Sequence, residues 1–92
     1  MKDLRYKFVT MVVQDMAQDI IGGYENSVAD GHLDKMPSRE QLEQEVYTAV
    51  MDTDRVKTAD GWRPVKQDIR FLGTPTLKLL VSIITERTLE DS

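Results

Sequence analysis

Apolar side chains recur every three or four residues along most of this chain, which is the pattern of helices that bury one face. Over residues 4–29 the repeating apolar positions, spaced four, three and four apart, are Val9, Val13, Met16 and Ile20. The pattern predicts one long helix over residues 4–29. Gly22 and Gly23 predict a stop or kink within it, because each glycine costs about 1 kcal/mol relative to alanine in a helix interior. Residues 30–37 then read as a loop.

A second helix is expected to open at Ser38 and to run to about residue 52. Ser38 and Gln41 have the spacing of a capping box, in which the serine hydroxyl accepts a backbone N–H of the first turn. The apolar positions of this segment fall on one face at intervals of four, at Leu42, Val46 and Val50. This is the clearest helical pattern in the chain.

Two more helices are predicted after residue 63. Pro64 favours the first turn of a short helix, and Gly73 favours its end. Thr74 is then expected to cap a last helix, with Pro75 at its first position. The inner positions of that helix are Leu77, Leu80, Val81 and Ile84.

Two segments allow a different interpretation. Residues 76–85 also show alternating apolar positions and β-branched side chains, which is typical of a strand. Asp60 and Gly61 can form a hairpin turn between residues 55–59 and 62–65, although Pro64 disfavours a regular second strand and we prefer a loop. We therefore predict a mainly α fold, a small bundle of three long or medium helices plus one short helix. The alternative is an α+β fold with a strand at 76–85 and a hairpin at Asp60 and Gly61.

Length and composition limit the class of protein. Ninety-two residues suit one domain with one modest core, so we expect a single small helical domain over residues 1–92. The absence of cysteine excludes disulfides and cysteine-ligated zinc or iron–sulfur sites, and it fits a reducing compartment. The sequence shows neither a signal peptide nor an apolar run that could span a bilayer, so a cytoplasmic location is expected.

The sequence contains no pattern that predicts catalysis. The sole histidine, His32, lies between Asp30 and Asp34 in a loop, without a second histidine or the helical spacing of a metal-ligand pair. A calcium loop starting at Asp52 is also excluded, because Lys57 occupies the position that requires glycine. We therefore predict a non-enzyme without a metal or a cofactor.

The last helix carries more apolar surface than one-sided packing requires. Leu79 and Ile83 widen its apolar arc to about 200° on a helical wheel, whereas an arc of about 100° suffices for a helix packed on one side. Either neighbours cover this helix on two sides, or Leu79 and Ile83 meet another chain. We therefore predict a protein-interaction or regulatory module that binds a protein partner, or itself as a homodimer. Tyr24 and Trp62 are expected to contribute to the same binding.

Charge gives an alternative function. Residues 55–70 contain five cations against two acids, around the aromatic Trp62; the cations are Arg55, Lys57, Arg63, Lys66 and Arg70. Cations beside a stacking aromatic are what single-stranded nucleic acids require of a binding surface. Residues 14–54 instead carry ten acids against Lys35 and Arg39, and the net charge of −4 disfavours nucleic-acid binding. Nucleic-acid binding is thus the second hypothesis.

Overall fold

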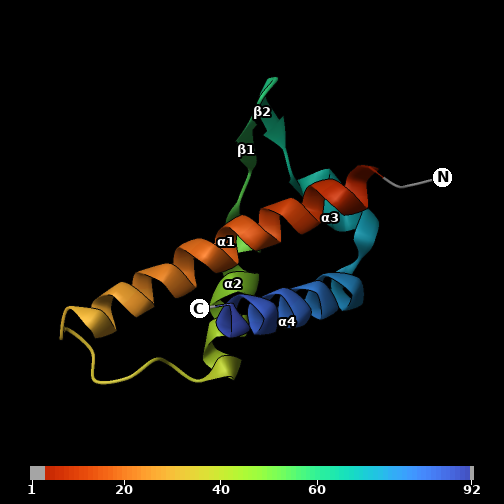
Figure 1. Cartoon of the computed structure of the whole chain (residues 1–92). Coiled ribbons are helices and arrows are strands. Elements are labelled where there is room, and N and C mark those ends of the chain that lie inside the picture. Colours follow the sequence, from red (N-terminus) through yellow and green to blue (C-terminus); the bar gives the residue numbers. More distant parts are fainter. Residues whose placement is uncertain (1–3, 92) are drawn as a thin grey trace.

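The computed structural model describes residues 4–91, which form four helices and one antiparallel hairpin (Figure 1). The elements, in chain order, are α1 (Leu4–Ala29), α2 (Arg39–Asp52), β1 (Arg55–Thr58), β2 (Gly61–Pro64), α3 (Lys66–Leu72) and α4 (Thr74–Glu90). The mainly helical fold is confirmed. The alternative strand at 76–85 is wrong, because α4 contains that whole segment. Within the described range, every helix is too short or too polar to cross a lipid bilayer.

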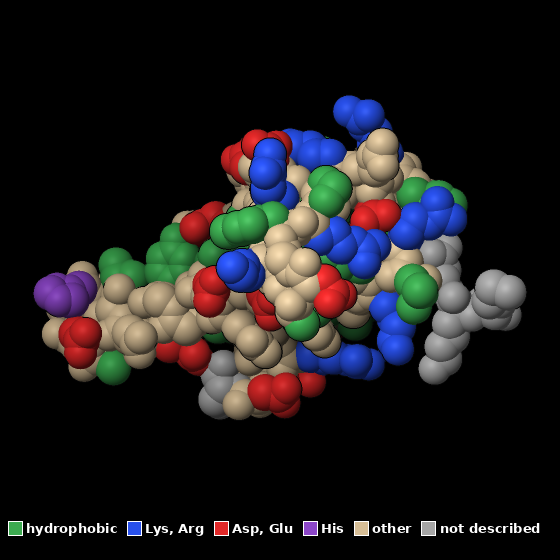
Figure 2. Space-filling model, turned by 90° about the horizontal axis from the view of Figure 1, so that it is seen from above, with side chains coloured by type: hydrophobic (Ala, Val, Ile, Leu, Met, Phe, Trp, Pro, Cys, Tyr) green, Lys and Arg blue, Asp and Glu red, His purple; other side chains and the backbone are tan. Residues whose placement is uncertain are grey.

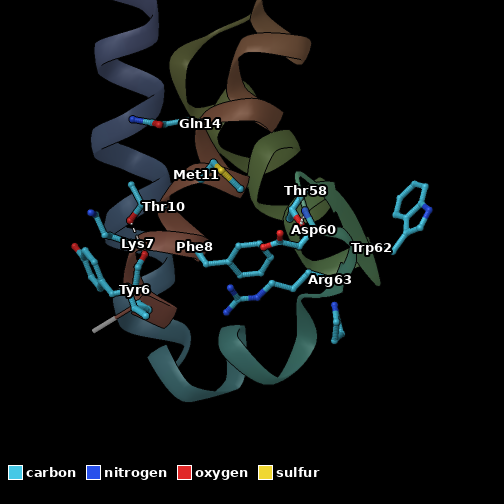
Figure 3. Close-up of a pocket in the computed structure, with 12 residues that line it drawn as sticks. Tyr6, Lys7, Phe8, Thr10, Met11, Gln14, Thr58, Asp60, Trp62 and Arg63 are labelled. Carbon is cyan, nitrogen blue, oxygen red and sulfur yellow. Dashed lines mark hydrogen bonds between the residues drawn. The ribbon is translucent and has the colours of Figure 1, made fainter. Parts of the chain in front are cut away.

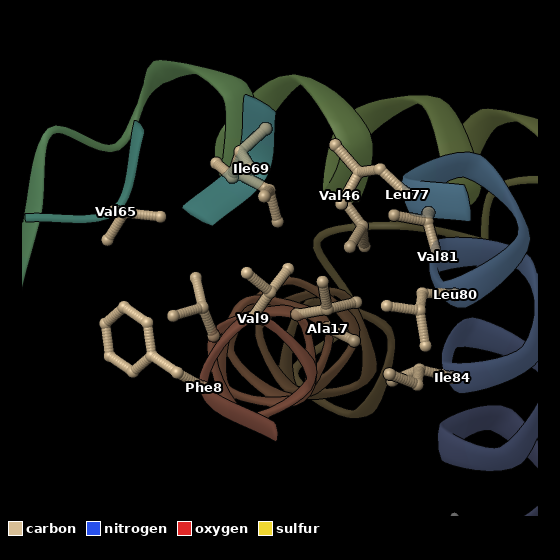
Figure 4. Packing of buried hydrophobic residues seen from close by; sticks show 13 residues of the cluster. Phe8, Val9, Ala17, Val46, Val65, Ile69, Leu77, Leu80, Val81 and Ile84 are labelled. Atoms are coloured by element: carbon tan, nitrogen blue, oxygen red, sulfur yellow. The ribbon is translucent and has the colours of Figure 1, made fainter. Parts of the chain in front are cut away.

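The core lies where α1, α2 and α4 meet, and α3 closes one end of it. Figure 4 shows side chains of α1 directed toward α2 and α4. Several β-branched residues at the predicted inner positions are fully buried, among them Val9, Val13, Val46 and Val50. Burying such a side chain completely contributes roughly 1.5–3 kcal/mol, so this cluster supplies much of the stability of the fold.

The helix α1 spans residues 4–29 as predicted and continues through Gly22 and Gly23, so a stop at these glycines is wrong. Tertiary contacts on either side of the pair outweigh the weak helix propensity of glycine. Ile21 is fully buried, and Tyr24 forms hydrogen bonds to α2. The helix ends at Ala29, as expected, and Gly31 follows with a φ of +82°.

The helix α2 begins where the capping pattern predicted. The Ser38 hydroxyl accepts the Gln41 backbone N–H at 3.2 Å, which satisfies one of the donors that a helix start leaves unpaired. At the other end, the Thr53 hydroxyl donates to the Ala49 carbonyl at 2.7 Å. Both ends of α2 are therefore fixed by local side-chain hydrogen bonds.

The connection between α2 and α3 is a β-hairpin, and our preference for a loop is wrong. Its turn is centred on Ala59 and Asp60, one residue earlier than the alternative placed it, with Thr58 opposite Gly61. A type I′ turn would need positive φ at both central residues, whereas Gly61 carries the positive φ, at +111°. The Thr58 hydroxyl donates to the Gly61 carbonyl at 2.8 Å and accepts the Asp60 N–H at 3.3 Å. This side chain closes the turn, a role that residue type alone did not indicate.

The starts of the last two helices also differ from the prediction. Pro64 pairs with Arg55 as the last residue of β2, so α3 begins two residues later, at Lys66. Gly73 ends α3, with a φ of +86°, as predicted. Gly73 occupies the N-cap position of α4 and Thr74 is its first residue, so the prediction that Thr74 caps this helix is wrong. Figure 1 shows the resulting arrangement, in which the hairpin projects on one side of α1 and α4 packs on the other.

Candidate functional site

The outer face of α4 carries the two residues that the sequence singled out. Leu79 is 61% exposed and Ile83 is 40% exposed, one helical turn apart. The opposite face of α4 is buried against α1 and α2 through residues such as Leu80 and Ile84. Neighbours within the described part of the chain therefore cover one side of α4 only. Leu79 and Ile83 stay partly exposed, which favours the second explanation for the wide apolar arc. We call these two residues the α4 stripe.

Polar groups border the α4 stripe where α4 meets α2. The Arg39 guanidinium contacts the Glu86 carboxylate of α4 at 3.1 Å and the Glu43 carboxylate at 3.0 Å. The hydrogen bond to Glu43, followed by the attraction of Glu86, raises the pKa of Arg39 above its usual value. The Ser82 hydroxyl also bonds Glu43, at 3.2 Å. An apolar centre with a polar border is the usual anatomy of a protein interface.

Tyr24 lies apart from the α4 stripe, in the contact between α1 and α2. Its hydroxyl lies 2.7 Å and 2.8 Å from the two carboxylate oxygens of Glu45, to which it donates. This hydrogen bond, together with partial burial, raises the pKa of Tyr24. The structure therefore gives Tyr24 a contact within the chain and does not bring it together with Leu79 and Ile83.

Trp62 and two of the cations share the outer face of the hairpin. Lys57 pairs directly with Trp62 across the two strands, and its ammonium lies 5.7 Å from the centroid of the indole. Arg55, two residues before Lys57 on β1, lies on the same face because side chains alternate along a strand. Trp62 is 64% exposed, and Figure 3 shows it pointing away from α1.

The remaining cations of residues 55–70 do not extend this face. Arg63 points toward α1, with its guanidinium carbon 3.9 Å from the centroid of the Phe8 ring, and it bonds the Asp68 carboxylate at 3.3 Å. The Lys66 ammonium donates to the Met51 carbonyl at 2.7 Å. Arg70 lies on α3. The basic stretch is therefore divided among separate surfaces.

A groove of about 850 Å³ lies between the first half of α1 and the hairpin (Figure 3). Leu4, Phe8 and Met11 line one wall, and Thr58, Asp60 and Arg63 line the other. We call it the hairpin groove. Sequence reasoning missed it, because Leu4 and Met11 read as ordinary positions of an amphipathic helix. Only the folded position of the hairpin brings residues 58–64 opposite α1.

The positions once considered for metal binding lie in ordinary local structure. His32 is exposed in the loop that follows α1, and Asp60 belongs to the hairpin turn. Across residues 4–91, no three acidic or histidine side chains are grouped as a metal ion would require. Comparison of the chain with protein-family models, with curated proteins and with solved structures gave no match.

Proposed function

We propose that this chain is a non-catalytic protein-interaction module of the cytoplasm, which binds a partner protein or a second copy of itself through the α4 stripe. The observation that carries this proposal is the exposure of Leu79 and Ile83 on a helix whose other face is already buried. Complete burial of a leucine or isoleucine side chain is worth roughly 1.5–3 kcal/mol. Covering the exposed parts of both side chains therefore offers a driving force that a partner can use.

The polar border of the α4 stripe supports the same proposal. Glu86 and Arg39 form an ion pair that connects α4 to α2 beside the stripe, which restricts both side chains before a partner arrives. Ordered border residues lose little conformational entropy on binding, and this reduces one of the main costs of association.

Sedimentation velocity at several protein concentrations tests the proposal. The parent is compared with Leu79→Glu and Ile83→Glu, and Leu33→Glu is the control, because Leu33 is 39% exposed in the loop before α2. If a second copy is the partner, the parent self-associates and both α4 variants are monomers, while the control behaves like the parent. If another protein is the partner, proteins retained by the immobilised parent are lost with both α4 variants and kept with the control. A monomeric parent whose retained proteins do not depend on Leu79 or Ile83 contradicts the proposal.

Nucleic-acid binding is the second candidate function, and the outer face of the hairpin favours it. Arg55, Lys57 and Trp62 are exposed together there, which combines phosphate-binding cations with a stacking aromatic. Titration of labelled single- and double-stranded oligonucleotides at low salt tests this function. Trp62→Ala should weaken binding, and Lys66→Gln should have little effect because Lys66 is bonded to α2. Absence of binding at low ionic strength, where such contacts are strongest, excludes this function.

A further inference from the structure

The hairpin groove combines an apolar interior with an accessible opening. Phe8 is buried at its base, while Met11 is 40% exposed and Leu4 is exposed more fully. A volume of about 850 Å³ is within the range of pockets that bind ligands in proteins. An exposed apolar surface gathered in one concave place, rather than scattered singly, marks a binding site for another molecule. This surface is separate from the α4 stripe, since the hairpin and α4 lie on opposite sides of α1 (Figure 1).

The two segments that form the groove are the basic part of an acidic chain. Residues 4–13 contain Arg5 and Lys7 without an acid, and the charged residues that line the groove are the cations Lys7 and Arg63 and the acid Asp60. Figure 2 shows Lys and Arg side chains gathered around the hairpin and the start of α1, away from the end that carries His32. Clustered charge of one sign attracts ligands of the opposite sign over about a Debye length, which is near 8 Å at physiological ionic strength. The groove therefore favours an acidic ligand.

The Arg63 side chain lies in the groove, in position to bind a carboxylate of a ligand. Its guanidinium stacks on the Phe8 ring and bonds Asp68, which is itself largely buried. The hydrogen bond to Asp68 uses one of the five N–H donors that a guanidinium carries. An arginine held by two contacts pays little additional entropy when a carboxylate binds its other donors. Lys7 lines the same groove from α1 and adds a second cation.

We propose that the hairpin groove binds an acidic peptide segment of another protein, which inserts a large apolar side chain between Met11 and the hairpin. The apolar interior receives that side chain, while Lys7 and Arg63 receive the carboxylates around it. A nucleic acid fits this groove less well, because its lining is largely apolar and supplies two cations, Lys7 and Arg63, beside the acid Asp60. This second binding surface goes beyond the proposed function and does not depend on the α4 stripe.

Selection from a phage-displayed library of random dodecapeptides tests the inference on the full chain. We expect the selected peptides to carry net negative charge and at least one large apolar residue. A labelled synthetic copy of the best peptide is then titrated against the variants. Lys7→Glu and Met11→Glu should each raise its dissociation constant roughly tenfold, which corresponds to about 1.4 kcal/mol. Binding to the parent should also weaken as salt is added.

Each groove variant has a matched control at the far end of α1. Lys35→Glu makes the same charge change in the loop after α1, and Leu33→Glu places the same carboxylate at a side chain of similar exposure to Met11. Both controls should bind the peptide like the parent, and circular dichroism should show all four variants folded. If Met11→Glu fails to fold, Lys7→Glu decides the result alone.

The inference would be overturned by a selection that enriches no sequence, by one that enriches neutral or basic peptides, or by binding that the groove variants leave unchanged. Leu79→Glu keeps this test distinct from that of the proposed function, because it should leave peptide binding intact. Peptide binding that is lost in Leu79→Glu but kept in Lys7→Glu would assign the peptide to the α4 stripe and refute the groove. An oligonucleotide that displaces the peptide in a groove-dependent manner would also refute the peptide as the natural ligand class.

Discussion

Thr85 provides a direct test of what a buried hydroxyl without a hydrogen-bond partner costs the fold. Its side chain is completely buried on the inner face of α4, and its hydroxyl has no hydrogen-bond partner within the described residues. A buried hydroxyl without a partner costs about 1–3 kcal/mol, because it has given up its hydrogen bonds to water. The substitution Thr85→Val keeps the branched shape and removes the polar atom, so we expect it to stabilise the fold.

Two favourable contributions and one unfavourable contribution determine how much Thr85→Val changes the free energy of unfolding. Removing the unpaired hydroxyl recovers about 1–3 kcal/mol, and the added methyl group contributes about 0.8 kcal/mol by burial. The methyl group is somewhat larger than the hydroxyl, so steric crowding in a close-packed core cancels part of this gain. We expect Thr85→Val to raise the free energy of unfolding by about 1–2 kcal/mol. The melting temperature should rise by roughly 4–8 °C for each kcal/mol in a domain of this size.

Urea unfolding followed by circular dichroism measures this change as a shift of the midpoint at constant slope. Thr88→Val is the matched control, because Thr88 lies on the same helix and its hydroxyl donates to the Ile84 carbonyl at 2.8 Å. This control should not gain stability, since it loses a formed hydrogen bond. An unchanged or lower midpoint for Thr85→Val would refute the reasoning and indicate that the hydroxyl is satisfied, for example by a buried water.

Three further predictions concern helix stability and pH. Gly22→Ala should raise the free energy of unfolding, measured in urea, by about 0.5–1 kcal/mol, because nothing lies within 4 Å of the added Cβ. A lower free energy of unfolding would imply that the added methyl group collides with a neighbouring atom. Ser38→Ala should lower it by about 1 kcal/mol through loss of the α2 cap, and an unchanged value would argue against the cap. The raised pKa of Tyr24 means that its hydrogen bond stabilises the fold fully below the unfolded-state pKa near 10, and that this stability is lost as pH rises through the folded-state pKa. Urea unfolding at increasing alkaline pH should therefore show a decline that Tyr24→Phe reduces, and an identical decline in both proteins would contradict the assignment.

The helical core was predictable because burial and periodicity agree along α2 and α4, and largely along α1, where Met16 and Ile20 are only partly buried. Val46 and Val50 are fully buried where the spacing placed them, and the Ser38 cap is local in sequence and easy to recognise. The hairpin was harder, because its turn is closed by the Thr58 side chain, which has no strong sequence signature. The continuity of α1 through Gly22 also depends on contacts with a distant helix, which a propensity scale does not contain.

The two candidate surfaces differ in how far the sequence could reveal them. The α4 stripe follows from helix geometry, since an apolar arc wider than its neighbours can cover must leave Leu79 or a similar residue exposed. The hairpin groove joins Met11 to residues some fifty positions later in the chain. No pattern within either segment predicts that contact, and the stacking of Arg63 on Phe8 becomes visible only once the chain is folded.

The two open edges of the hairpin affect how readily molecules of this protein pair with one another. Each strand of this two-stranded sheet has a single neighbour, so backbone groups along both outer edges are available to pair with strands of other molecules. Arg55 and Lys57 place like charges along β1, and Pro64 removes a backbone donor from β2. These residues discourage edge-to-edge pairing of the hairpin with strands of other molecules.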